Sequence, residues 1–104
     1  MLPKKLPSQT VLKELFDYDN ESGRLIRKYH PSKFQQHLVG KPAGSQKPNG
    51  RYQVVIDSEI YLHARLVYAY HFGDTEFEID HRDGDCSNDC IWNLREANDN
   101  QQQH

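Results

Sequence analysis

Apolar and polar positions repeat with two different periods along this chain, and the change of period separates helices from strands. Residues 10–17 carry apolar side chains on one helical face, after Ser or Thr residues that can cap a helix. Residues 24–29 and 51–57 alternate in the manner of strands, and residues 60–62 predict a returning strand. Between them, residues 30–50 contain three Pro and three Gly, so we expect a loop with at most a short strand, and the Asn-Gly turn signal at its end predicts a hairpin.

In the second half of the chain the period becomes helical and then changes again. A helix is expected from His63, and Gly73 is a typical residue at which a helix ends. The remaining pattern predicts four short elements: a strand at 77–81, a polar loop at 83–89, an apolar return at 91–92 and, capped by Asn93, a helix from Leu94 to about Gln103.

Short strands mixed with helices predict the α+β class. The expected organisation is an N-terminal part over residues 1–73, with helices and a β-hairpin or three-stranded sheet, and a second unit over residues 74–104, together one compact domain. Apolar residues make up only 36% of the chain, and the mean hydropathy is −0.94. So small a core predicts modest stability, which a bound metal ion or DNA would increase.

The composition also bears on location. No apolar run approaches the roughly 20 residues that cross a bilayer, so no membrane partner is expected. The first seven residues are basic and proline-rich, without the apolar stretch of a signal peptide. Two cysteines, Cys86 and Cys90, are too few for a disulfide framework, so reduced thiols and a cytoplasmic location are expected.

Charge is distributed unevenly along the chain. Residues 1–51 hold ten Lys/Arg and four acidic residues, a balance of +6, whereas residues 52–104 hold three Lys/Arg and eleven acidic residues, a balance of −8. This polarity suggests a polyanion at one end and a cation at the other, although solvated charges that keep a protein soluble would look the same.

The adjacent residues Asp80 and His81 can divide the work of phosphodiester hydrolysis. A carboxylate is a hard oxygen ligand for Mg²⁺ or Mn²⁺, which would polarise a phosphate. The neighbouring His points to the other face of a strand, where it can act as a general base near neutral pH. Asp-His pairs are common in proteins, so the surrounding residues decide the meaning of this one.

Those surrounding residues resemble the core motif of phage HNH endonucleases, I-D-H-x-x-G-D followed by a short polar loop and N-L-R-x-A. The matching residues, without insertion or deletion, are Ile79, Asp80, His81, Gly84, Asp85, Asn93, Leu94, Arg95 and Ala97. A less specific resemblance to small phage members extends over about residues 11–103. The chain differs from the usual pattern by having Asn88-Asp89 in the order opposite to the family's Asp-Asn. It also carries His63 one position before the family's His, which is followed directly by Arg.

The resemblance implies a ββα-metal fold for the second unit and a site with one Mg²⁺ or Mn²⁺ ion. Asp80 would be a metal ligand and His81 the general base, while Asn93 would orient His81 or hold the loop. The second protein ligand would come from the following helix, where the family's spacing from Asn93 leads to Gln102. Alternatives close to it are Asn98, Asn100 and His104.

DNA is the partner that the resemblance implies, cut on one strand or both, in the host cytoplasm if the chain is encoded by a phage. The residues expected to contact DNA are Lys41, Lys47, Arg51, Arg65 and Arg95. The alternatives are a DNA-binding module with a degenerate nuclease site, and a structural metal- or calcium-binding domain, against which the basic half argues. Spacing in the 83–89 loop does not fit a calcium loop, so its polar residues are interpreted as turn formers that hold Asp80 and His81. His63 is expected to be a packing or surface residue. Trp92 is expected to lie in the core.

Overall fold

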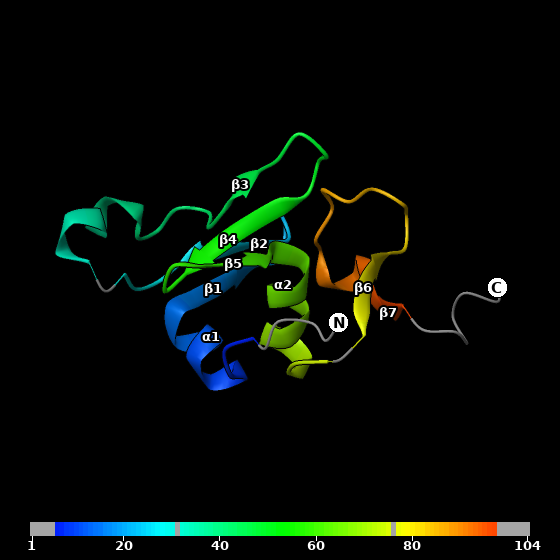
Figure 1. The fold of residues 1–104 in the computed structure, drawn as a ribbon, viewed down its shortest axis with the longest axis horizontal. Coiled ribbons are helices and arrows are strands. Elements are labelled where there is room, and N and C mark those ends of the chain that lie inside the picture. The colour runs from blue at the N-terminus through cyan, green and yellow to red at the C-terminus, as the bar shows by residue number, and fades with distance from the viewer. Residues whose placement is uncertain (1–5, 31, 76, 98–104) are drawn as a thin grey trace.

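Short antiparallel strands dominate the computed structural model, which describes residues 6–30, 32–75 and 77–97 (Figure 1). Within these residues the strands form three small sheets, β1–β2, β3–β4–β5 and β6–β7, and two α-helices pack with them. The α+β class predicted by the sequence pattern is therefore confirmed. No helix in the described ranges has the length and apolar character needed to cross a membrane.

The N-terminal elements are a capped helix and a β-hairpin. Helix α1 spans Gln9–Leu15, and the Ser8 hydroxyl accepts a hydrogen bond from the Val11 amide. Strands β1 (Phe16–Asp19) and β2 (Arg24–Arg27) follow. The helix ends before residue 17, where the sequence predicts its end, because Phe16 takes an extended conformation and pairs with Arg27. That change places the Phe16 ring in the core.

Between β2 and the next sheet the chain makes a long excursion, which includes the 3-10 helix η1 (Lys33–Leu38). Backbone hydrogen bonds close its base, from the Arg27 amide to the Lys41 carbonyl (2.9 Å) and from the Gly40 amide to the Arg27 carbonyl (2.7 Å). Figure 1 shows the excursion projecting from the end of the molecule opposite to β6.

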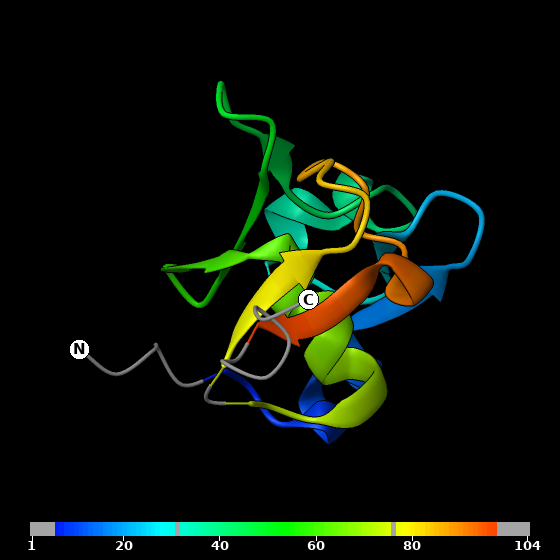
Figure 2. The same cartoon turned by 90° about the vertical axis from the view of Figure 1, so that its right-hand side faces the viewer.

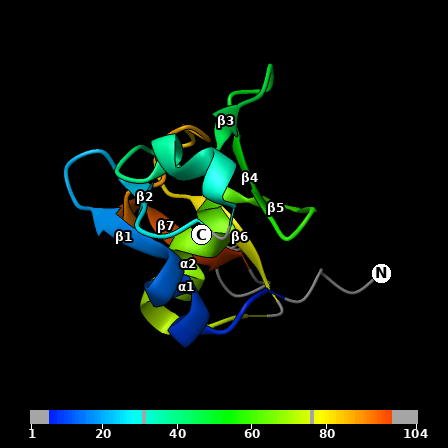
Figure 3. The same cartoon turned by 90° about the vertical axis from the view of Figure 1, so that its left-hand side faces the viewer.

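The central sheet consists of β3 (Ser45–Gln46), β4 (Tyr52–Ile56) and β5 (Glu59–Leu62). The predicted turn at Asn49-Gly50 connects β3 to β4. Figures 2 and 3 show this hairpin from opposite sides, and in both views its tip rises on the same side of the body as the loop after β6. The hairpin tip and this loop therefore belong to one surface of the molecule.

Helix α2 (His63–Phe72) is the element around which the sheets are arranged. It contacts elements of all three sheets, and its buried Leu66 and Val67 belong to one apolar cluster that extends from Leu6 to Leu94. The predicted end of this helix is confirmed, since Gly73 adopts a φ of +90° and its amide donates to the Ala69 carbonyl.

The last sheet pairs β6 (Glu78–His81) with β7 (Leu94–Ala97), after the 3-10 turn η2 (Ile91–Asn93). The prediction of a helix starting at Leu94 is wrong for residues 94–97, because they pair with β6 and form the return strand themselves. Residues 91–92 are a turn rather than that strand. Trp92 is 64% exposed, not core, because the turn directs Asn93 inward instead. The rest of the predicted helix lies outside the described residues.

Candidate functional site

Asp80 and His81 occupy the end of β6 and differ sharply in environment. The His81 residue is 6% exposed, whereas the Asp80 side chain is 45% exposed, as the alternation of a strand predicts. Oδ2 of Asp80 accepts a hydrogen bond from Nε of Arg95 (3.0 Å), its partner on β7, and lies 2.9 Å from Nη2 of the same guanidinium in an ion pair. Oδ1 of Asp80 has no hydrogen bond among the described residues, so it is the oxygen that could bind a cation.

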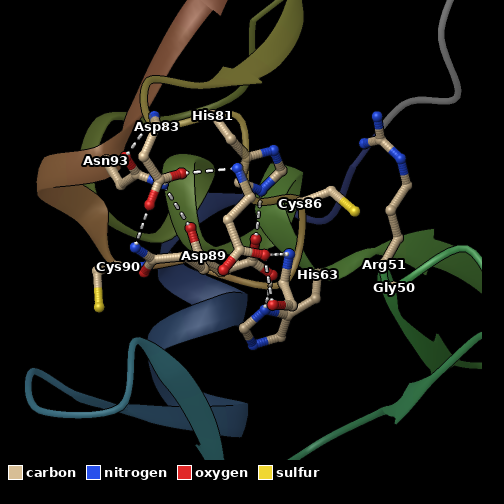
Figure 4. Close-up of polar contacts among 12 residues, drawn as sticks. Gly50, Arg51, His63, His81, Asp83, Cys86, Asp89, Cys90 and Asn93 are labelled. Carbon is tan, nitrogen blue, oxygen red and sulfur yellow. Dashed lines mark hydrogen bonds and ion pairs between the residues drawn. The ribbon is translucent and has the colours of Figure 1, made fainter.

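His81 is held from the interior by a carboxylate. Its Nε2 lies 2.6 Å from Oδ1 of Asp89, a residue that is 1% exposed. The other oxygen of Asp89 lies 2.6 Å from Nδ1 of His63, the first residue of α2. Nε2 of His63 in turn accepts a hydrogen bond from the Leu25 amide on β2 (3.0 Å). Figure 4 shows the Asp89 carboxylate between the two rings. We call His63, Asp89 and His81 the buried triad.

Asn93 holds the loop between β6 and η2. Its side chain is fully buried, with Oδ1 accepting from the Asp83 amide (3.1 Å) and Nδ2 donating to Oδ1 of Asp83 and to the Asn88 carbonyl (both 2.9 Å). Hydrogen bonds from Asn88, the Asp85 amide and Asn93 lower the pKa of Asp83, and hydrogen bonds from Ser87 lower that of Asp85.

Of the two roles that the resemblance offers for Asn93, these contacts favour holding the loop. None of its hydrogen bonds among the described residues goes to the His81 ring. The imidazole is oriented by Asp89 instead. The expected turn-forming role of the loop's polar residues therefore fits Asp83 and Asp85, whereas Asp89 holds the His81 ring.

Two of the expected DNA contacts lie on the β3–β4 hairpin, next to the His81 site. The hairpin tip touches the loop, since the Cys86 thiol donates to the Asn49 carbonyl (3.2 Å). Arg51 follows this tip and shares a small pocket with His81 and Asp89. Figure 4 shows the Arg51 guanidinium on the Cys86 side of the site. Lys47 is exposed at the hairpin, and Lys41 is exposed farther away, at the base of the excursion.

The other two expected DNA contacts have partners within the protein. Arg65 donates to the carbonyls of Phe77 (3.0 Å) and Thr75 (2.9 Å) and to Asp74 (3.2 Å), and its side chain is only 12% exposed. It therefore ties α2 to the connection before β6 and presents little surface to DNA. Arg95 is paired with Asp80. Gln102, the expected second metal ligand, lies outside the described residues.

Sequence reasoning missed the buried triad, because it assigned His63 to packing or surface and Asp89 to a turn. A signal was nevertheless present, since both residues mark positions where the chain departs from the family pattern. His63 stands one position early, and Asp89 comes after Asn88 rather than before it. Taken together, the two departures introduce an acid and an imidazole that can pair, and in the structure they do.

Comparisons of this chain with protein-family models, with curated proteins and with solved structures found no match. In the part of the chain that the structure describes, no three His, Cys, Asp or Glu side chains are grouped as a metal site. Both cysteines are free thiols. The geometry around His81 and the charges near it are therefore the features of this protein that bear on its function.

Proposed function

We propose that this protein is a metal-dependent endonuclease of the HNH type, which hydrolyses phosphodiester bonds of DNA by nicking or by cutting both strands. The observation that carries the proposal is the environment of His81, whose Nε2 is held by a buried carboxylate while Nδ1 has no partner among the described residues. Asp80, one residue earlier, offers a half-exposed carboxylate. The antiparallel pair β6–β7 supplies the two strands that a ββα-metal unit requires.

In this proposal His81 is the general base. Its Nδ1 takes a proton from a water molecule as that water attacks phosphorus, and the bond from phosphorus to the leaving oxygen breaks. Among the described residues, Nε of Arg24 is the one side-chain polar atom that is fully buried and has no hydrogen-bond partner. Nδ1 of His81 has no partner either, so it is not fully buried. The ring cannot turn away easily, because Asp89 holds its other nitrogen.

Asp80 is the proposed protein ligand of one Mg²⁺ or Mn²⁺ ion, with Gln102 as the second. Its free Oδ1 fits this role, since both ions prefer hard oxygen ligands. Such an ion would supply positive charge that stabilises the transition state and the leaving oxygen. Arg95 competes for the same carboxylate, so we expect metal binding by the protein alone to be weak.

DNA is the proposed substrate because the segment whose hairpin tip reaches the candidate site carries positive charge without negative charge. Residues 22–56 contain seven Lys/Arg and no Asp or Glu, and they form β2, the excursion and the β3–β4 hairpin, whose tip touches the loop after β6. A run of cations with no acidic residue favours a phosphate backbone as partner. We call Lys41, Lys47 and Arg51 the proposed DNA surface.

The test compares His81→Ala with His37→Ala, which removes an exposed imidazole from η1. We expect His81→Ala to reduce cleavage of supercoiled plasmid in Mg²⁺ or Mn²⁺ by about 10²–10⁴-fold while DNA binding persists, because a general base acts in the transition state. His37→Ala should cut like the parent, and EDTA should stop both. A His81→Ala protein that cuts as fast as the parent would refute the assignment.

The second candidate function is a DNA-binding protein whose nuclease site is degenerate. The Asp80–Arg95 pair favours it, because the guanidinium already neutralises the carboxylate expected to bind the metal. A parent protein that binds duplex DNA but leaves plasmid uncut in both metals would support this alternative.

A further inference from the structure

The buried triad contains two titratable side chains, His63 and Asp89, that general-base catalysis by His81 does not itself require. Both are almost completely buried, at 0% and 1% exposed. They connect three separate segments of the chain: the start of α2, the loop after β6, and β2, through the Leu25 amide. Burying an ionisable side chain costs free energy unless hydrogen bonds compensate, so such groups are normally held in one specific arrangement. The positions of their protons can therefore be worked out from their hydrogen-bond partners.

The Leu25 amide determines which nitrogen carries the proton in each imidazole of the buried triad. A backbone N–H can only donate, so Nε2 of His63 must present a lone pair to it. The proton of a neutral His63 ring is therefore on Nδ1, from which it is donated to Oδ2 of Asp89. Asp89 accepts this bond at one oxygen and faces Nε2 of His81 with the other.

A carboxylate oxygen accepts, so Nε2 of His81 must carry a proton. When the ring is neutral, its lone pair is then on Nδ1. We propose that Asp89, backed by His63, is a positioning residue that fixes His81 in the tautomer whose Nδ1 can accept a proton. The tautomer itself is a property of the free protein, whereas its consequence for cleavage rests on the proposed function.

Asp89→Asn tests this arrangement because the two side chains have the same shape. The His63 proton still points at residue 89, so the amide oxygen must face His63 and the amide NH₂ must face His81. The opposite orientation would require a proton on Nε2 of His63, against the Leu25 amide. Nε2 of His81 then becomes an acceptor and the proton of His81 moves to Nδ1, which removes the proposed base without removing the ring.

The measurement is the tautomer of each ring, from two-bond ¹⁵N–¹H correlation spectra of the full chain without DNA or metal, at about pH 8.5, where an ordinary imidazole is neutral. His71 is an internal control, because its Nδ1 lies 2.9 Å from the Val67 carbonyl and must carry the proton in every variant. In the parent we expect the proton of His63 on Nδ1 and that of His81 on Nε2. In Asp89→Asn only His81 should change.

A matched control removes the same charge from the same loop without touching either ring. Asp85→Asn meets this need, because its carboxylate bonds to Ser87 and not to an imidazole. It should leave all three tautomers as in the parent. If the Asp89→Asn protein does not fold, as judged by circular dichroism, the parent spectrum alone decides, since a proton on Nδ1 of His81 or on Nε2 of His63 would overturn the proposal.

Cleavage assays then separate the two proposals. If both hold, Asp89→Asn should lose plasmid cleavage by about 10²–10⁴-fold, as His81→Ala does, while retaining DNA binding and the parent's melting temperature within a few degrees. Tautomers as expected in a parent that cuts no DNA would overturn the nuclease assignment and leave the positioning role intact. An Asp89→Asn protein in which His81 keeps its proton on Nε2 would overturn the positioning role, whatever the cleavage rate.

Discussion

Asn93→Ala should destabilise the fold considerably, although the resemblance would make this residue part of the catalytic site. The change removes three hydrogen bonds from a fully buried side chain, one of them to the Asp83 carboxylate. A bond to a charged group contributes about 1.5–3 kcal/mol and a neutral one about 1 kcal/mol. Because Asp83 is exposed and water can replace part of what its atoms lose, we expect a net loss of about 3 kcal/mol.

The assay is urea unfolding followed by far-UV circular dichroism, with the slope of the transition compared between proteins. A loss of about 3 kcal/mol is a large fraction of the roughly 5–15 kcal/mol that stabilises an ordinary domain, and should lower the melting temperature by at least about 10 °C. Asn88→Ala is the matched control, because its half-buried side chain makes fewer bonds: Nδ2 donates to Oδ2 of Asp83 (2.9 Å), and Oδ1 accepts one long bond from the Cys90 amide (3.4 Å). We expect it to lose about 1 kcal/mol. An Asn93→Ala protein no less stable than the Asn88→Ala protein would refute the role assigned here.

Two further predictions concern the backbone and the charges. Gly23→Ala should lower the free energy of unfolding by at least about 2 kcal/mol more than Gly40→Ala, as measured by thermal unfolding. Both glycines have positive φ, but of the two only Gly23 would place the added Cβ against backbone, 2.5 Å from the Cys90 nitrogen. Equal losses of stability would contradict this close approach. Replacing all three residues of the proposed DNA surface with Gln should lower the log–log salt dependence of DNA binding by about one unit for each phosphate that the variant no longer neutralises. An unchanged slope would mean that these charges are merely solvated.

Local pattern alone predicts most of the elements, because their causes are local. The Asn49-Gly50 turn and the glycine after α2 depend on conformations that few other residues adopt at low cost. The same reasoning failed at Leu94–Ala97, whose residues all favour a helix. There the pairing with β6 outweighs the intrinsic preference, since each strand satisfies the other's backbone groups. Nothing within four residues of Leu94 indicates that partner.

By itself the sequence determined which side chains carry candidate chemistry and that Asp80 and His81 face opposite ways, because the period of a strand is two. Only the tertiary structure decided what those side chains meet. Asp89 reaches His81 across eight residues and His63 across 26, and the Leu25 amide reaches His63 across 38. Such contacts depend on how α2 packs against the sheets, and the tautomer of an imidazole depends on the neighbour that packing provides.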